Sequence, residues 1–412
     1  MASDLYSGTA KLPPFAAIWR NLRDLPRAMT LGSFISGLLV VVVAATGPIV
    51  IMLQAAHSGN FTTGQTATWI CSSWATSGLF GLYLSLRYRM PMIGSTSTAA
   101  IVLLVTSLQS HSAQEAVASY MIVALLFIIV GITDLMPRIM KAIPHQIVMA
   151  MLAGILFNFG VGVFTNFTSQ PWIVAAMVLT YFLARVLKLR APVIPVLIVG
   201  VLVSALLHRI SYKGAHFGLT HLVWISPHFT IGSVINLALP MFLLTLATQF
   251  APGFAVLKSN GYKAAHSASL ISSGIISLAS AGFLNSGINT SAITASIAVG
   301  EHADPDRTTR YSAGFTTGLF YIAAGLCGAS IVTFFGALPA AALAALAGLA
   351  LFPALATSMH EALVHSASRE AALATLLITI SGVHPWQLGS PFWGLLVGIA
   401  LYALPNLRSR AA

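Results

Sequence analysis

The sequence predicts an all-α polytopic membrane protein with fourteen transmembrane segments, and three observations support this fold class. Of the 412 residues, 57% are hydrophobic and only 7% are charged, and the mean hydropathy is +0.87. Charged residues normally make up about a quarter of a soluble protein. The apolar residues form runs of about the twenty residues that cross a bilayer as a helix. The basic residues are scattered in the short segments between these runs.

Twelve of the predicted segments are continuous apolar runs. They cover residues 33–54, 65–85, 116–134, 145–163, 170–187, 192–208, 232–256, 265–283, 312–335, 339–357, 370–383 and 390–406. Gly47-Pro48 predicts a kink in the first of them. The third and tenth segments, 91–108 and 285–301, are interrupted by polar residues, and in each we expect an extended stretch followed by a short half-helix.

The distribution of basic residues predicts the topology. With both termini in the cytoplasm, 18 of the 20 Lys and Arg residues fall on the cytoplasmic side, and only Arg209 and Lys213 fall outside. This agrees with the positive-inside rule. If either broken segment were a loop that does not cross the membrane, the inner and outer sides would be exchanged for every later segment, and the basic residues would no longer lie on the cytoplasmic side. Both segments are therefore expected to cross. The net charge of +11 could suggest nucleic-acid binding, but basic residues scattered between apolar runs are what the topology of a multi-pass membrane protein requires.

The two halves of the chain repeat. Ala142-Ile143-Pro144 opens one segment and Ala337-Leu338-Pro339 opens another, with an offset of 195 residues between the prolines. The same offset carries Ser95-Thr96 in the first broken segment onto Thr290-Ser291 in the second. Because seven spans per repeat is an odd number, the second repeat is predicted to be inverted relative to the first.

The broken segments predict a binding site. Irregular polar backbone survives at membrane depth only where protein or a water-filled cavity covers it. The half-helices are expected to start near Ser97 and near Thr290, with their N–H groups and positive dipole ends facing a common centre that suits an anion. Capping and close packing are the alternative roles for any single hydroxyl. The predicted substrate-binding residues here are Ser95, Thr96, Ser97, Thr98, Ser286, Asn289, Thr290 and Ser291.

The segment 232–256 adds Thr248, Gln249 and Phe250 to the predicted site. A glutamine in mid-membrane is costly without a partner, so Gln249 is expected to face the substrate or another helix. Phe250 could stack on a flat substrate, and apolar packing is the alternative.

The acidic residues are informative by their positions. None of the nine Asp and Glu residues falls at a predicted mid-membrane position, so the centre offers donors without a carboxylate and favours an anion over a cation. Asp134 and Glu301 lie nearest the membrane, at helix ends, and are weak candidates for proton coupling; solvated helix ends are the alternative.

The sequence offers little for an enzyme or a metal site. His208, His216, His221 and His228 share one outer loop, but their spacings match no compact metal-ligand motif. Nucleophile, phosphate-binding and dinucleotide-binding motifs are also missing. We therefore expect a protein that is not an enzyme and needs no cofactor.

Three segments carry a family resemblance. Met136–Gly160 (MPRIMKAIPHQIVMAMLAGILFNFG), Leu246–Tyr262 (LATQFAPGFAVLKSNGY) and Ser286–Ile297 (SGINTSAITASI) resemble the benzoate–proton symporter family of BenE type. The later segments 318–329 and 390–398 are also similar, so the resemblance covers about residues 30–406. The family belongs to the seven-plus-seven inverted-repeat transporters, which include uracil permeases and sulfate-type anion carriers.

The resemblance implies a core domain that holds the substrate and moves against a gate domain. Residues 1–30 would form a cytoplasmic arm. The core would comprise 31–134 (spans 1–4) and 231–336 (spans 8–11), and the gate 135–230 (spans 5–7) and 337–412 (spans 12–14). Nucleobase relatives carry acidic residues where this chain has Thr248 and Thr294. The loss of both carboxylates weakens a nucleobase interpretation and fits a substrate that brings its own negative charge, with Thr294 beside it.

The sequence thus predicts a transporter that imports benzoate or a similar aromatic carboxylate by proton symport, with alternating access of core against gate. An inorganic-anion or dicarboxylate exchanger on the same fold is one alternative, and an uncoupled channel or facilitator is another. The expected partners are the substrate, protons and the lipid bilayer. A homodimer is a hypothesis by analogy with related folds.

Overall fold

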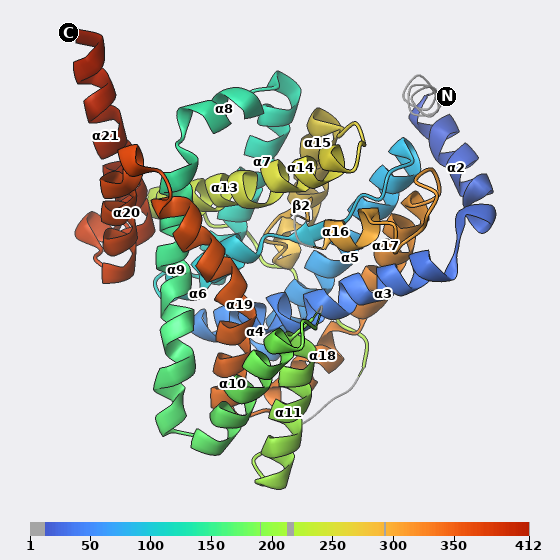
Figure 1. Cartoon of the computed structure of the whole chain (residues 1–412), viewed down its shortest axis with the longest axis horizontal. Coiled ribbons are helices and arrows are strands. Elements are labelled where there is room, and N and C mark those ends of the chain that lie inside the picture. The colour runs from blue at the N-terminus through green and yellow to red at the C-terminus, as the bar shows by residue number, and fades with distance from the viewer. Residues whose placement is uncertain (1–12, 190, 212–217, 292–293, 412) are drawn as a thin grey trace.

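A computed structural model describes residues 13–189, 191–211, 218–291 and 294–411, which fold into a helical bundle around one pair of short strands (Figure 1). Lys11, Arg190, Lys213 and His216, to which the sequence analysis assigned positions, lie outside the described residues.

The elements of the first half follow the predicted segments. The first apolar segment is broken at Gly47 into two helices, which confirms the kink expected there. The elements are α2 (Pro14–Ala28), α3 (Leu31–Thr46), α4 (Pro48–Ser58), α5 (Thr63–Tyr88), β1 (Gly94–Thr96), α6 (Thr98–Ser107), α7 (Ala113–Thr133), α8 (Met136–Ala142), α9 (His145–Thr165), α10 (Pro171–Val186) and α11 (Val193–Leu206).

The second half repeats this order. Its eighth segment is one helical run built from α12 (Ile231–Ser233), η2 (Val234–Ala238), α13 (Leu239–Thr245), η3 (Leu246–Phe250) and α14 (Ala251–Ser259). The strand and the α-helices that follow are α15 (His266–Ser280), β2 (Ile288–Thr290), α16 (Ala295–Val299), α17 (Tyr311–Leu326), α18 (Gly328–Gly336), α19 (Ala340–Leu363), α20 (Arg369–Ser381) and α21 (Ser390–Ala411).

Membrane-spanning character is clear for some of these helices. Five helical runs among the described residues are long and apolar enough to cross a bilayer: Leu31–Ser58, Ala113–Thr133, His145–Thr168, Ile231–Ser259 and Ala340–Leu363. The pair α17 and α18, bent by 64°, makes a sixth if it is one span. Four further apolar helices are shorter, so the count of fourteen stays a prediction.

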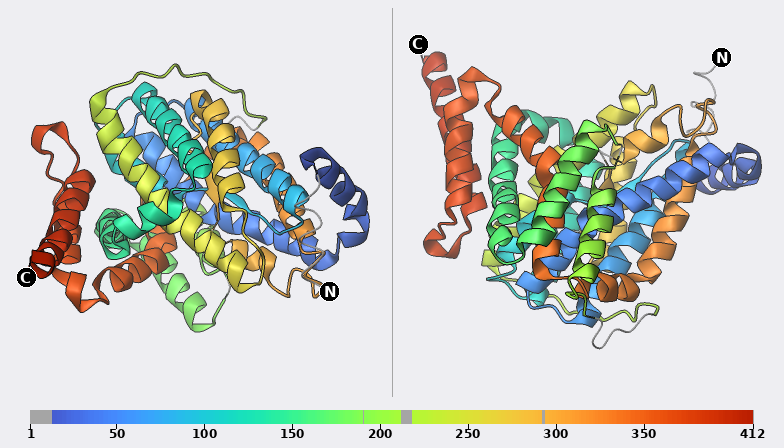
Figure 2. Two further views of the ribbon diagram at one scale, coloured as in Figure 1. Left: turned by 90° about the horizontal axis from the view of Figure 1, so that it is seen from above. Right: turned by 60° about the horizontal axis from the view of Figure 1, so that its bottom comes forward.

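Helices from the two halves pack in pairs. α5 packs along α17, α7 along α15, and α9 along α19. Glycines permit the close approach: a Cβ at Gly78 of α5 would lie 2.5 Å from the carbonyl oxygen of Gly318 of α17. Small residues at such contacts let helix backbones approach in a membrane, where the hydrophobic effect does not drive helices together. α20 and α21 lie at one edge of the bundle and α2 at the opposite edge (Figures 1 and 2).

The N-terminal arm contains a helix that the sequence analysis did not predict. α2 is fixed to the end of α5, because buried Asn21 donates from Nδ2 to the Leu86 carbonyl at 2.7 Å. Arg89 also pairs with Asp24 at 2.8 Å. The arm is therefore part of the folded bundle from Pro14 onward.

The eighth segment contains two π-helical turns, η2 and η3, each of which ends two residues before a proline. Pro240 and Pro252 have no N–H to donate to the carbonyls of Asn236 and Thr248, four residues earlier. The helix widens there instead, and Leu239 and Ala251 donate to carbonyls five residues back. Such π turns are frequent at functional sites.

Candidate functional site

The two broken segments meet as an antiparallel pair of strands. β1 and β2 pair Gly94 with Thr290, Ser95 with Asn289, and Thr96 with Ile288. Ser95 Oγ also donates to Asn289 Oδ1 at 3.4 Å. Residues almost 200 positions apart thus meet near the centre of the molecule (Figure 1).

Neighbouring helices satisfy the backbone of these strands. Ile288 N donates to Ser277 Oγ of α15 at 2.9 Å, and the Ile288 carbonyl accepts from Ser273 Oγ of the same helix. On the other strand, a Cβ at Gly94 would collide with the Ser77 carbonyl of α5. Backbone groups at membrane depth need such internal partners, since lipid offers none. The strands are therefore held rigidly between α5 and α15.

A tight turn before β2 positions the second strand. Asn285, fully buried, donates from Nδ2 to Ser280 Oγ at 2.6 Å and to Thr76 Oγ1 at 3.1 Å, and its Oδ1 accepts from Gly287 N at 3.1 Å. Ser286 Oγ accepts from Trp69 Nε1 at 3.3 Å. Ser286 was predicted to bind substrate, and in this structure its hydroxyl is engaged by the indole.

The two half-helices differ from each other. α6 begins at Thr98, and Ser97 caps it by accepting from Ala100 N at 3.2 Å, which confirms the start predicted near Ser97. The second half-helix was predicted to start near Thr290, and this was wrong. Thr290 is in β2, and α16 begins at Ala295 with only five residues. Hydrogen bonding between the two segments continues one residue beyond β2, because Ser291 N–H donates to the Ile93 carbonyl at 2.9 Å. This bond keeps the chain extended at Ser291.

Ser291 and Thr294 form the turn into α16. Their hydroxyl groups are hydrogen-bonded to each other, and Thr294 N donates to Ser291 Oγ at 3.2 Å. Both residues are buried. The dipole of a helix this short is small, so the positive end of α6 is the stronger of the two.

The turn η3 lies against β2. Thr248 donates from Oγ1 to the Leu244 carbonyl at 2.7 Å, while Thr248 and Gln249 are half-buried. Phe250 is fully buried, and its ring packs at 5.1 Å between centroids against Phe127. The structure places Phe250 among aromatic side chains, which favours the packing alternative.

Two polar atoms at the strands have no protein partner. Asn289 Nδ2 and Thr290 Oγ1 are buried and make no hydrogen bond within the described part of the chain. A buried donor without a partner costs about 1–3 kcal/mol. Ser95 and Thr98 beside them are half-buried, whereas Thr96 and Ser97 are buried. The site therefore contains unused hydrogen-bonding capacity next to partly accessible hydroxyls, as a polar ligand would require.

Asp134 and Glu301 lie away from these unpartnered atoms. Asp134 ends α7, Glu301 follows α16, and both side chains are exposed. The structure does not bring either carboxylate to the strands.

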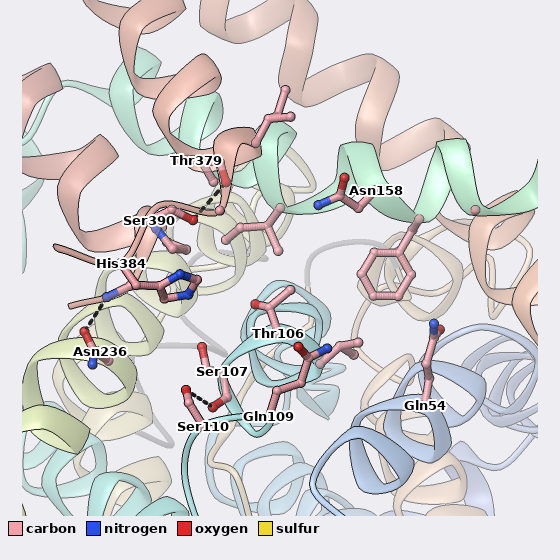
Figure 3. Close-up of a pocket in the computed structure, with 18 of the residues that line it drawn as sticks. Gln54, Thr106, Ser107, Gln109, Ser110, Asn158, Asn236, Thr379, His384 and Ser390 are labelled. Carbon is pink, nitrogen blue, oxygen red and sulfur yellow. Dashed lines mark hydrogen bonds between the residues drawn. The ribbon is translucent and has the colours of Figure 1, made fainter. Parts of the chain in front are cut away.

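A separate cavity of about 420 Å³ lies beyond the C-terminal end of α6 (Figure 3). None of the predicted site residues lines it. Its walls are apolar at Ile155 and Phe159 and otherwise rich in amides, hydroxyls and imidazoles: Gln54, Thr106, Ser107, Gln109, Ser110, His111, Asn158, Asn166, Asn236, Thr379, His384 and Ser390. The described lining residues include no Asp, Glu, Lys or Arg.

The sequence analysis did not assign a role to most of this lining. Asn158 and Asn166 lie on and just after an otherwise apolar helix, α9, and polar residues at membrane depth were the available signal. Asn236 lies in η2, and the available signal for an irregular turn there was Pro240, two residues after its end. The clustering of α6, α9, α20 and the loop before α21 could not be read from a single sequence.

The paired strands and the half-helices behind them define the class of protein. Over 95% of its length the chain is similar to 71% of murine Slc26a9, an anion transporter captured in the inward-facing state, with a TM-score of 0.60 and 13% identity. It is similar over 90% of its length to 96% of the transmembrane domain of a cyanobacterial bicarbonate transporter, BicA, with a TM-score of 0.56 and 14% identity. The chain therefore shares its fold with these two proteins.

Sequence similarity narrows this class to a family. The model of the benzoate membrane transport proteins, BenE, matches residues 28–404, and the chain belongs to that family. It is 36% identical over 381 residues to a benzoate membrane transport protein of Acinetobacter baylyi, covering 92% of this chain and 97% of the relative. It is also 34% identical over 375 residues to the inner membrane protein YdcO of Escherichia coli, covering 91% and 96%.

Proposed function

We propose that this protein imports benzoate or a similar aromatic carboxylate across the bacterial inner membrane by proton symport. Family membership supports the substrate class, since the Acinetobacter relative is named for benzoate transport. The observation that carries the proposal is the pair of unpartnered groups, Asn289 Nδ2 and Thr290 Oγ1, beside the start of α6. These groups offer hydrogen bonds and a positive dipole end, and no carboxylate competes with an anionic substrate.

The carboxylate of the substrate would accept from Asn289, Thr290 and the hydroxyls of Ser95 and Thr98. The aromatic ring would lie along η3, where Gln249 is half-buried and orients it. Ser97, Ser286, Ser291 and Thr294 would hold the strands and helix starts in place, because their hydroxyls bond to protein. Phe250 would support η3 from behind.

We further propose fourteen spans in two inverted repeats of seven. The pairing of α5 with α17 and of α15 with α7 supports this. In the proposed repeats, span 2 (α5) is equivalent to span 9 (α15), and span 4 (α7) is equivalent to span 11 (α17). The pair of α5 with α17 is therefore equivalent to the pair of α15 with α7. The antiparallel register of β1 and β2 also fits an axis that lies in the membrane plane.

Both termini are proposed to be cytoplasmic. α2, α8 and the start of α15 lie toward the top of Figure 1, together with the C-terminal end of α21, whereas α11 and α18 lie toward the bottom. Several of the predicted cytoplasmic segments therefore lie toward the same end of the bundle, which supports this orientation. With this orientation the cavity beyond α6 faces outward, between the core (31–134 and 231–336) and the gate (135–230 and 337–412).

Alternating access would arise from movement of core against gate. Uptake of an anion into a negative interior costs about 2.3 kcal/mol per charge and 100 mV. One proton carried with each carboxylate removes this cost and adds the pH gradient as a driving force. Asp134 and Glu301, exposed at helix ends, are weak candidates for the carrier.

A second candidate function is transport of an inorganic anion or dicarboxylate. The similarity in fold to Slc26a9 and BicA favours it, because those proteins are named as anion and bicarbonate transporters. Inhibition of labelled benzoate uptake by excess chloride, bicarbonate or succinate would support this alternative. Inhibition by substituted benzoates alone would support the aromatic carboxylate.

Uptake of labelled benzoate into proteoliposomes under an imposed pH gradient tests the main proposal. We expect accumulation above the external concentration when the outside is acidic, and collapse of that accumulation when a protonophore is added. Equilibration without accumulation would instead indicate an uncoupled channel or facilitator.

A further inference from the structure

His111 lies in the wall of the cavity and belongs to a hydrogen-bonded chain of lining residues. His111 Nε2 is 3.3 Å from Asn236 Nδ2, and Asn236 Oδ1 accepts from Gly389 N at 2.8 Å. His111 follows α6, Asn236 is in η2, and Gly389 is in the loop between α20 and α21. The chain thus joins two segments of the proposed core to a loop of the proposed gate.

The orientation of the Asn236 amide sets the role of His111 Nε2 in this bond. Gly389 N donates to Asn236 Oδ1, so the amide nitrogen faces the ring, and Nε2 of a neutral ring accepts from it. In a protonated ring both nitrogens donate. Nε2 then faces another donor, and the amide of Asn236 has to turn so that Oδ1 meets the ring. The turned amide presents Nδ2 to Gly389 N, two donors, and the bridge to the loop is lost.

The carboxylate of Glu115 lies beside the ring of His111. Its Oε1 lies 3.6 Å from His111 Nδ1, longer than a hydrogen bond, while the same oxygen accepts from Thr230 Oγ1 at 2.8 Å. Its Oε2 accepts from Ser112 N at 2.9 Å. The side chains of His111 and Glu115 are only 11% and 18% exposed, so water screens their interaction weakly.

Few other charges face this pair. His384 of the loop before α21 lines the same cavity, and His228 touches the start of α7 through its backbone N–H, which donates to the Gln114 carbonyl. A second histidine–carboxylate contact, His145 to Glu361 at 2.8 Å, joins α9 to α19 but is 45% and 40% exposed. It lines no part of the cavity and provides a matched control.

We propose that His111 is the residue that couples protonation to the outer gate. Protonation of this ring, which lies beside the carboxylate of Glu115, turns the amide of Asn236 and frees the loop at Gly389, so that the cavity between core and gate changes its opening. This inference rests on the proposed proton symport, for which it names a titrating group in addition to the weak candidates Asp134 and Glu301.

Spin labels across the cavity test the inference without substrate. Cysteines replace Ser110 and Val383, both exposed, in a chain whose native Cys71 and Cys327 are changed to alanine. We expect the population with the longer distance between the two spin labels to grow as the pH falls from 8 to 5. His111→Gln, which cannot be protonated, should abolish this change, and His145→Gln should leave it intact. If the label-to-label distance in the His111→Gln protein still changes with pH as it does in the parent protein, the proposal is overturned.

Two further measurements keep the result decisive. If His111→Gln does not fold, Glu115→Gln replaces it and is expected to move the distance transition to lower pH; an unmoved transition contradicts the proposal. Benzoate uptake in proteoliposomes separates this inference from the proposed function. Wild-type protein without proton-driven uptake would refute the function, whereas proton-driven uptake with unaltered pH dependence in His111→Gln would refute only the role of His111.

Discussion

Replacement of Asn289 by alanine tests the binding site most sharply. Asn289 is fully buried in β2, its Oδ1 accepts only a long bond from Ser95, and its Nδ2 has no partner among the described residues. The apo protein therefore gains little from this amide. A substrate carboxylate would gain a hydrogen bond to it, and such bonds to charged groups contribute about 1.5–3 kcal/mol.

The expected effect of Asn289→Ala is a loss of benzoate affinity of roughly 10- to 150-fold, since each 1.4 kcal/mol is a factor of ten. Thermal stability should change little, because removing an unpartnered buried donor offsets the lost packing. Equilibrium binding of labelled benzoate to purified protein measures the first quantity, and a thermal melt measures the second.

Asn260→Ala is the matched control. Asn260 Nδ2 donates to the Val256 carbonyl at 2.9 Å at the end of α14, so its removal should lower stability slightly and leave benzoate affinity unchanged. If Asn289→Ala folds and binds benzoate within twofold of the wild type, the carboxylate does not lie at Asn289 and the site is placed wrongly.

Four further variants test the fold and the site. Ser277→Ala should lower the free energy of unfolding by about 1–3 kcal/mol in chemical denaturation, because Ile288 N–H loses its partner; an unchanged midpoint would show that another group satisfies it. Gly78→Leu should reduce the yield of folded protein on size-exclusion chromatography, because any Cβ there meets the backbone of Gly318, and normal yield would contradict the close packing of α5 and α17. Asp24→Asn should cost at most about 1 kcal/mol in the same denaturation assay, since the pair with Arg89 is partly exposed; a larger loss would mean that α2 depends on this pair. Thr290→Ala combined with Ser97→Ala should reduce benzoate uptake at least tenfold, and unchanged uptake would argue against the site.

The central architecture could be predicted because polar composition at membrane depth is so restricted. Ser95 and Asn289 lie in stretches that cannot be ordinary spans, and the shared offset of 195 residues placed them in equivalent parts of the two halves. Lipid forces such stretches to pair with protein, and the strands β1 and β2 do so. The break at Gly47-Pro48 was predictable for a similarly local reason.

The errors arose where tertiary contacts override local pattern. The apolar run after Thr290 predicts a helix there, but pairing with Ile93 keeps the chain extended to Ser291 and shortens α16 to five residues. Phe250 was a candidate for substrate stacking because a sequence does not show which side of a helix Phe127 covers. The helix α2 was missed because its contact with Leu86 is polar and distant in sequence.

The cavity was beyond sequence reasoning for a different reason. Its lining comes from segments spread between Gln54 and Pro391, and each polar residue taken singly has an ordinary packing role. Only their assembly around one space gives His111 and Asn236 a common function.

A structure of the protein with benzoate bound tests the central claim most directly. The account predicts the benzoate carboxylate within hydrogen-bond distance of Asn289 Nδ2 and Thr290 Oγ1, at the start of α6, with the ring along η3. Benzoate bound instead only in the cavity beside Gln54 and Asn158, with the strands unoccupied, would contradict it.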